Sequence, residues 1–196
     1  MYLLANFEEL DPTRSALLRS GLELLAERGY KGAITREIAQ RAGVSEVTLF
    51  RHYGSKESLL REAVHRLRPP IEAVLPVPSA DIEADLVQLV ANYSRVLEAN
   101  GGLLVRLLSE LTRHPELVEG GGLVGLAGAM RAGFDFMAGR QRAGLLRDDE
   151  PPTQAMLALM GPVFARKILT GVMGLELPLD PQAHVRGFLE GRRKDG

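Results

Sequence analysis

Residues 35–56, TREIAQRAGVSEVTLFRHYGSK, constrain the fold more than any other stretch of this chain. Apolar residues recur at helical spacing over residues 35–42 and again over 46–53. Between the two runs, Gly43 can adopt the positive φ that a turn directly after a helix needs, and Ser45 is a favourable N-cap for the second helix. Two short helices joined by a glycine turn predict a helix-turn-helix, whose second helix enters the major groove of DNA.

The outward face of the second helix carries side chains that suit DNA. A glutamate can accept a hydrogen bond from cytosine N4, and the methyl groups of valine and threonine can contact the thymine methyl. Arginine and histidine suit phosphates or purine edges. The residues expected on this face are Glu46, Val47, Thr48, Arg51 and His52. The alternative interpretation is a solvent-exposed face on an ordinary helical hairpin.

A third helix is predicted to begin directly after this pair. Gly54 can end the second helix, and Ser55 is a suitable N-cap for the next one. Lys56 would then lie at a helix N-terminus, where a phosphate meets a cation and free backbone N–H groups together. We therefore expect Lys56 to contact the DNA backbone.

These residues resemble a known family. The glycines, caps and core positions of residues 12–62 fall in register with the N-terminal signature of the TetR family of bacterial transcriptional regulators. The signature positions are Gly29, Tyr30, Thr35–Ala39, Ala42–Ser45, Thr48–Phe50, His52, Tyr53, Ser55–Glu57 and Leu59.

The resemblance implies an all-α homodimer, usually a repressor that leaves palindromic operator DNA when a small molecule binds its C-terminal domain. By position, it implies DNA contacts from Thr35, Arg36, Ser45, Val47, Thr48, Phe50, His52 and Lys56. Two positions depart from the pattern. Phe50 stands where the family more often has tyrosine, which removes a hydroxyl from the phosphate contacts. Val47 stands where a smaller residue is common, which makes a base contact there more apolar.

The distribution of charge fits a site-specific DNA-binding protein. Residues 28–68 hold nine basic and four acidic residues, a net charge of +5, whereas the whole chain carries −1. A basic module on an acidic body favours binding at particular sites over general packaging of nucleic acid.

Composition narrows the class of protein further. The 196 residues suffice for one or two domains with real cores, and no cysteine is present to form disulfides. Residues 1–10 lack the features of a signal peptide, and no apolar run approaches the roughly 18 residues of a membrane span. We expect a soluble, cytoplasmic protein without a membrane partner.

The predicted domains are a DNA-binding domain at 1–54 and a helical effector-binding and dimerisation domain at 55–196, with helix 55–68 as the link. Residues 1–10 are predicted to form a loose arm, and the Pro-rich residues 69–80 a connector. Other helices are expected at 12–28, 81–99, 103–113, 116–141, 153–173 and 181–189, with a glycine break at 100–102 and a kink or break at Pro162.

A stripe of large apolar side chains in the body is the candidate effector pocket. Methionine and phenylalanine line adaptable apolar pockets, although such a stripe is also typical of plain core. The predicted pocket residues are Tyr93, Leu107, Leu126, Met130, Phe134 and Met137. We expect a hydrophobic ligand, which an arginine would anchor if it carries an acidic group.

The last two helices carry more apolar surface than a terminal element of a monomer needs. Small residues along 153–173 would allow close approach of another helix. The predicted dimer-interface residues are Met156, Met160, Phe164, Ile168, Val185 and Phe188. The pattern alone shows only that these residues are buried against something.

The sequence offers little for catalysis. Its histidines lack the i, i+4 spacing of a helical metal site and a nearby set of carboxylates. We therefore expect no enzyme activity, catalytic residue, metal site or cofactor. Two functions remain: a ligand-responsive repressor, or a helical interaction module on the same scaffold that is controlled by a protein partner. An internal cavity in the body would favour the first, and a solid core the second.

Overall fold

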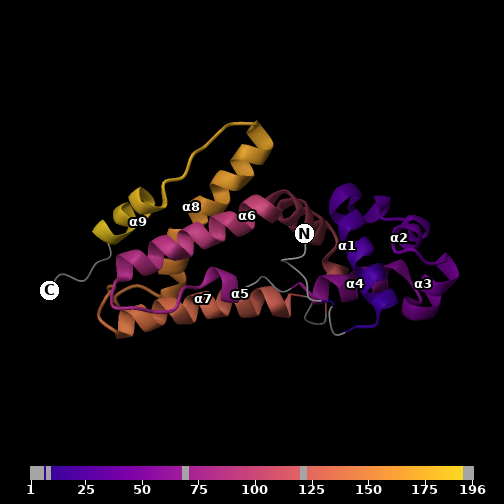
Figure 1. The fold of residues 1–196 in the computed structure, drawn as a ribbon, viewed down its shortest axis with the longest axis horizontal. Helices are drawn as coiled ribbons and strands as arrows, with labels where there is room; N and C mark the ends of the chain where they lie inside the picture. The colour runs from indigo at the N-terminus through magenta and orange to yellow at the C-terminus, as the bar shows by residue number, and fades with distance from the viewer. Residues whose placement is uncertain (1–6, 8–9, 68–70, 120–122, 192–196) are drawn as a thin grey trace. The chain divides into compact units, whose positions relative to one another are not determined.

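The fold was obtained as a computed structural model that describes residues 7, 10–67, 71–119 and 123–191, apart from the side chains at 101 and 172. Over these residues the regular elements are helices, which confirms the predicted all-α class (Figure 1). In chain order they are α1 Pro12–Gly32, α2 Thr35–Arg41, α3 Glu46–Tyr53, α4 Lys56–His65, α5 Ile71–Val74, α6 Ile82–Arg113, the 3-10 helix η1 Pro115–Leu117, α7 Val124–Arg142, α8 Pro152–Met173 and α9 Pro181–Glu190.

The chain divides into two compact units. The first comprises residues 1–69 and 102–127, and the second comprises 70–101 and 128–196. The predicted boundary at residue 54 does not coincide with this division, because α4 packs against α1 in the first unit.

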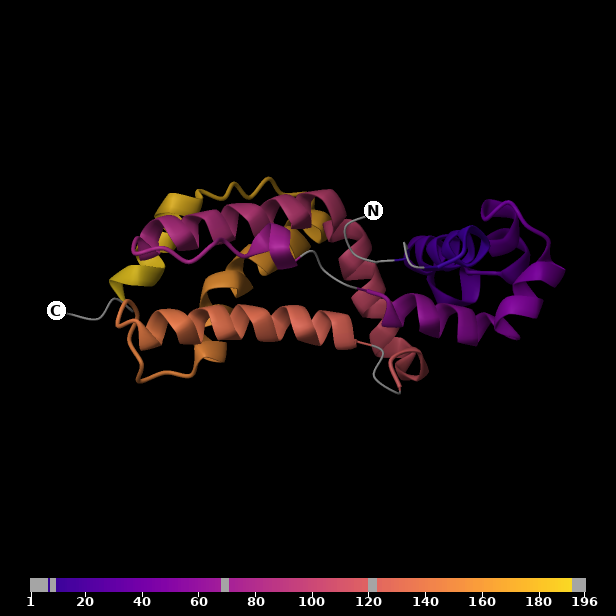
Figure 2. The ribbon, with the colours of Figure 1, turned by 60° about the horizontal axis from the view of Figure 1, so that its bottom comes forward.

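Packing of α1 on α4 builds the core of the first unit (Figures 1 and 2). Asp11 caps α1 by accepting hydrogen bonds from the backbone N–H groups of Thr13 and Arg14, each at 3.1 Å. The buried residues that meet in this core include Leu17, Leu18, Leu22, Leu25, Leu59, Leu60, Ala63 and Val64.

Two predictions about the first unit need correction, and a third is incomplete. The arm at 1–10 is not loose at Phe7, whose side chain is buried in the core and whose carbonyl accepts a hydrogen bond from the Ser15 hydroxyl at 2.7 Å. Gly29 interrupts the helix as predicted, at φ 73°, but after this kink a last turn of α1 continues to Gly32. The linking helix, expected over 55–68, ends at His65, and Arg68 lies outside the described residues.

The body helices also differ from the prediction. The expected break at 100–102 is absent, and α6 runs through it. A glycine inside a helix costs only about 1 kcal/mol relative to alanine, whereas Leu97 and Leu107 on either side are buried. The helix expected from residue 116 begins at Val124, after η1, and the glycine run at 120–122 lies outside the described residues.

Two proline-containing segments add detail to the prediction. The connector at 69–80 holds the single-turn helix α5. Pro162 does not break α8, because it is exposed and solvent can satisfy the carbonyl that its missing N–H leaves free.

Polar side chains tie the second unit together. The Arg140 guanidinium donates to the Ser79 carbonyl at 2.8 Å and lies 3.3 Å from the buried Asp85 carboxylate. The Asn92 amide donates to the Val74 carbonyl at 3.1 Å, which fixes α5 on α6. Because the Asp85 and Asn92 side chains are buried, their hydrogen bonds are needed to offset the cost of desolvation.

Glycines in different backbone conformations provide a test of the turn. Gly43 has φ 73° and open space around the position of a Cβ, so Gly43→Ala should lower the free energy of unfolding by about 1–2 kcal/mol through backbone strain alone. Gly139 lies within α7 and also has open space, so Gly139→Ala should raise it by about 0.5–1 kcal/mol. Urea denaturation measures both, and effects of equal sign would contradict the assigned turn.

Candidate nucleic-acid interface

The predicted helix-turn-helix is present as α2, a tight turn and α3. Gly43 adopts φ 73°, and the N–H of Val44 donates to the Ala39 carbonyl at 3.0 Å. The Ser45 hydroxyl accepts from the Thr48 N–H at 3.1 Å and so caps α3. These local contacts fix where the second helix begins and the direction in which it leaves the turn.

Two side chains anchor α3 to the rest of the first unit. Leu49 is fully buried, and Tyr53 is nearly so. Burial raises the pKa of the Tyr53 hydroxyl above its usual value, and the Arg14 guanidinium beside it acts in the opposite direction. Arg14 in turn contacts both carboxylate oxygens of Glu62 on α4 at 3.1 Å. The inward face of α3 is therefore held by α1 and α4 together.

A hydrogen bond joins the beginnings of α2 and α3. The Thr35 hydroxyl donates to Glu46 Oε1 at 2.5 Å. This bond occupies one oxygen of the carboxylate that was predicted to read cytosine, so a base contact by Glu46 would use its other oxygen. Ser45 is likewise engaged as a cap, with its hydroxyl 2.9 Å from that of Thr48.

The outward face of α3 is more apolar than expected. Val47 is 77% exposed, Phe50 is 45% exposed, and Arg51 is also exposed. Their spacing of three and four residues places them on one side of the helix. Ile34, directly before α2, is 51% exposed and was not among the predicted contacts, because an isolated isoleucine beside a helix start gives no signal of exposure.

Five arginines of α1, α2 and α4, or directly after α4, already have carboxylate partners. The ion pairs are Arg14–Glu62, Arg28–Glu37, Arg41–Glu23, Arg41–Glu27, Arg61–Glu57 and Arg66–Glu62. Among the described residues, Arg36 and Arg51 are exposed and have no carboxylate partner. The positive charge left for an anionic ligand therefore includes two arginines of the helix-turn-helix.

Lys56 has an internal partner. Its ammonium group donates to the Tyr30 carbonyl at 2.8 Å and lies 4.2 Å from the centroid of the Tyr30 ring. Partial burial lowers the pKa of Lys56 below its usual value. Because an ammonium has three N–H groups, two remain for the predicted phosphate contact. Ser55 caps α4 as expected, with its hydroxyl accepting from the Ser58 N–H at 3.0 Å.

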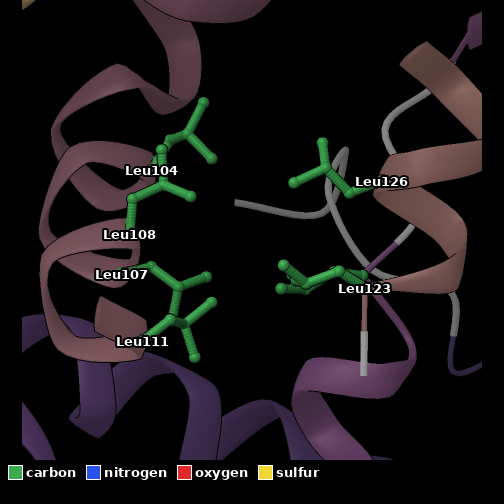
Figure 3. Close-up of a pocket in the computed structure, with 7 residues that line it drawn as sticks. Leu104, Leu107, Leu108, Leu111, Leu123 and Leu126 are labelled. Carbon is green, nitrogen blue, oxygen red and sulfur yellow. The ribbon is translucent and has the colours of Figure 1, made fainter. Parts of the chain in front are cut away.

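Leucine side chains of the first unit enclose a small cavity (Figure 3). In the close-up, the leucines of α6 face Leu123 and Leu126 across the space. Its volume is about 20 Å³, and its lining is entirely apolar. The lining residues are Leu67, Leu104, Leu107, Leu108, Leu111, Leu123 and Leu126.

The cavity brings together only two of the predicted pocket residues, and the effector site stays a prediction. Leu107 and Leu126 line the cavity, whereas Tyr93 and Phe134 do not. Met130 is 47% exposed, and Met137 is fully buried. The predicted stripe on α7 therefore does not face one shared space, since Met130 points toward solvent and Met137 toward the core.

The residues of the predicted dimer interface differ in how much they are buried, and the interface stays a prediction. Met156, Val185 and Phe188 are buried within the single chain, so they cannot form a surface in this conformation. Met160, Phe164 and Ile168 are half-buried. The exposed apolar side chains of this region are instead Leu157, Leu169, Met173 and Leu175.

In the part of the chain that the structure describes, no three side chains of the metal-binding types gather to hold an ion. Over the same residues, no helix combines the length and the apolar character that a bilayer span requires.

Comparison with known proteins supports the DNA-binding assignment. Residues 17–63 match the profile of bacterial regulatory proteins of the tetR family. The HTH-type transcriptional regulator YvkB of Bacillus subtilis is 31% identical over 78 residues, 40% of this chain and 41% of YvkB. The regulator UidR of Escherichia coli K12 is 26% identical over 117 residues, 56% of this chain and 57% of UidR. These relatives are regulators and not enzymes.

The likeness in structure extends further than the likeness in sequence. The flavonoid-responsive regulator FrrA superposes with a TM-score of 0.70 at 22% identity, over 95% of this chain and all of FrrA. This similarity shows the fold alone. In sequence, the chain spans about half the length of YvkB and UidR.

Proposed function

Because this chain belongs to the TetR family of bacterial transcriptional regulators, we propose that it is a dimeric repressor that a small hydrophobic ligand releases from a palindromic operator. Each subunit places α3 in the major groove, with the two half-sites about one helical turn, roughly 34–36 Å, apart. The protein works in the cytoplasm, where the operator is, and Thr35, Arg36, Ser45, Thr48 and His52 contact the DNA around α3.

The observation that carries this proposal is the uneven pairing of charge. Arg36 and Arg51 are exposed and lack carboxylate partners among the described residues, while Arg41 is tied to two glutamates. Unpaired arginines suit phosphates or guanine, and the apolar Val47 and Phe50 beside Arg51 suit contacts with thymine methyl groups.

The pairing of charge predicts how two arginine variants differ in DNA binding. A duplex selected from random sequences by the wild-type protein serves as the operator. Arg51→Ala should weaken binding and lower the slope of log affinity against log salt by about one per half-site. Arg41→Ala removes equal charge but should leave the slope nearly unchanged, because its charge is already neutralised. Equal slopes for the two variants would contradict this geometry.

Dimerisation is proposed to use the outer face of α8. Leu157, Gly161, Ala165, Leu169 and Met173 follow one i, i+4 row of this helix. Leu157, Leu169 and Met173 are exposed, and the small residues between them would let a second helix approach closely. A palindromic operator has two equivalent half-sites, so the partner that we place on this face of α8 is a second copy of the chain.

Charge on this row should therefore separate the subunits. Leu169→Glu places a carboxylate where the proposed interface is apolar, and leaving it unpaired there costs several kcal/mol. Sedimentation velocity should show a monomer, and operator affinity should fall with it. Val77→Glu is the control, since Val77 is 88% exposed and lies off α8. A dimeric Leu169→Glu protein would refute the assigned face.

The leucine cavity is the proposed point of entry for the effector. Its lining is apolar, so the inserted part of the ligand is a hydrocarbon group. At about 20 Å³ the cavity is far smaller than ligand pockets of roughly 300–1,000 Å³, so binding must enlarge it. Because the ligand binds only when the cavity opens, it can shift the population toward the conformation released from DNA. To move this equilibrium almost completely, the ligand must bind the released conformation more tightly than the DNA-bound one by about 5.5 kcal/mol.

Filling the cavity should block release without disturbing DNA binding. Leu126→Phe adds bulk to the cavity wall, while Met130→Phe adds similar bulk one turn later, at a position that is 47% exposed. Operator binding is measured with and without an inducer found by screening apolar compounds. Loss of induction in Leu126→Phe alone supports this site, and normal induction in both variants rejects it.

The small volume also supports the alternative function, a helical module controlled by a protein partner. Such a protein would bind its operator but release it for no small molecule. Co-purification of a stoichiometric partner that lowers operator affinity, together with failure of the apolar screen, would favour this second candidate.

A further inference from the structure

Tyr30 is held from three directions within the first unit. Its backbone N–H donates to Glu110 Oε2 at 2.7 Å, and its carbonyl accepts from the Lys56 ammonium at 2.8 Å. Its ring stacks on His114, with 4.3 Å between centroids. Tyr30 therefore joins the end of α6 to the first residue of α4.

The kink in α1 creates the need for Glu110. Gly29 leaves helical conformation at φ 73°, so Tyr30 begins a new turn and its N–H has no acceptor within α1. The Glu110 carboxylate supplies that acceptor from another helix. A Cβ at position 29 would lie 2.9 Å from Glu110 Oε2, so glycine provides both the conformation and the space for the carboxylate.

The groups that hold Tyr30 are themselves fixed. Glu110 Oε1 accepts from the Arg113 guanidinium at 2.8 Å, and the carboxylate is only 14% exposed. The Tyr30 N–H, followed by Arg113, holds the pKa of Glu110 below its usual value, so the group is charged at neutral pH. His114 Nδ1 lies 2.9 Å from Glu116 Oε1, which orients the ring against Tyr30.

We propose that Glu110 is a positioning residue for DNA binding, which acts through Tyr30 to hold the Lys56 ammonium beside the DNA backbone. This inference rests on the proposed function. The Glu110–Tyr30–Lys56 chain of hydrogen bonds connects a carboxylate at the end of α6 to a cation in the predicted DNA-contacting set. Glu110 touches no DNA itself.

The same two turns of α6 carry Glu110 and part of the cavity wall, Leu107 and Leu111. A ligand that enlarges the cavity by displacing these turns also displaces the carboxylate from Tyr30. The chain of hydrogen bonds thus gives the effector a second route to the DNA contacts, in addition to movement of α4.

A double-mutant cycle on operator affinity tests the proposal. Lys56→Ala and Glu110→Ala should each weaken binding by roughly tenfold and lower the salt slope by about one per half-site. The double variant should lose no more than Lys56→Ala alone, because Glu110 acts through Lys56. Glu110→Gln keeps an acceptor for Tyr30 and should restore most of the affinity. Losses that multiply in the double variant would overturn the proposal.

Two further measurements separate positioning from general instability. Arg131→Ala removes an exposed cation that takes no part in this chain of hydrogen bonds and should change neither affinity nor salt slope appreciably. Amide hydrogen exchange at Tyr30 should be slow in wild type and Glu110→Gln but fast in Glu110→Ala. Unchanged exchange in Glu110→Ala would overturn the proposal. If the wild-type chain bound no duplex at all, the proposed function would fail. Hydrogen exchange at Tyr30 would still test whether its N–H is bonded to the Glu110 carboxylate.

Discussion

The close packing of α1 against α4 supports everything that the first unit presents to DNA. The two helices approach so closely that a Cβ on Gly21 would lie 2.4 Å from Leu59 Cδ2. Leu49 and Tyr53 of α3 are buried in the same core. The orientation of α3 therefore depends on the packing of α1 against α4, together with the contacts that α3 makes with α2. Because interiors pack densely, a shift of α4 cannot be absorbed there and reaches α3 directly.

Features fixed by local chemistry could be predicted from the sequence. Ser45 caps α3 and Gly43 takes the positive φ, as expected, because the contacts involved span only a few residues. The all-α class followed from apolar periodicity. The α-helical bounds of α3 coincide with the predicted residues for the same reason.

Features that depend on distant contacts could not be predicted. The pairing of Arg41 with Glu27, 14 residues away, removes a cation that counts as free in the sequence tally. Periodicity marks residues as buried but does not say against what. Val185 and Phe188 face the core of their own chain, while Leu169 on α8 faces outward, although all three look alike in the pattern. Continuity of α6 through 100–102 likewise depends on leucines that are buried on both sides of the glycines.

The internal pairing of cations has a consequence for how such a protein searches a genome. Affinity for arbitrary DNA comes almost entirely from neutralised phosphates, and each lost contact reduces it steeply. A chromosome offers about 10⁶–10⁹ competing sites, which hold most copies of a strongly basic protein away from their target. In the proposed role as a regulator, the ion pairs that tie Arg14, Arg28 and Arg41 to glutamates would limit that trapping. Few molecules per cell would then suffice to keep one operator occupied, and occupancy would respond quickly to a change in their number.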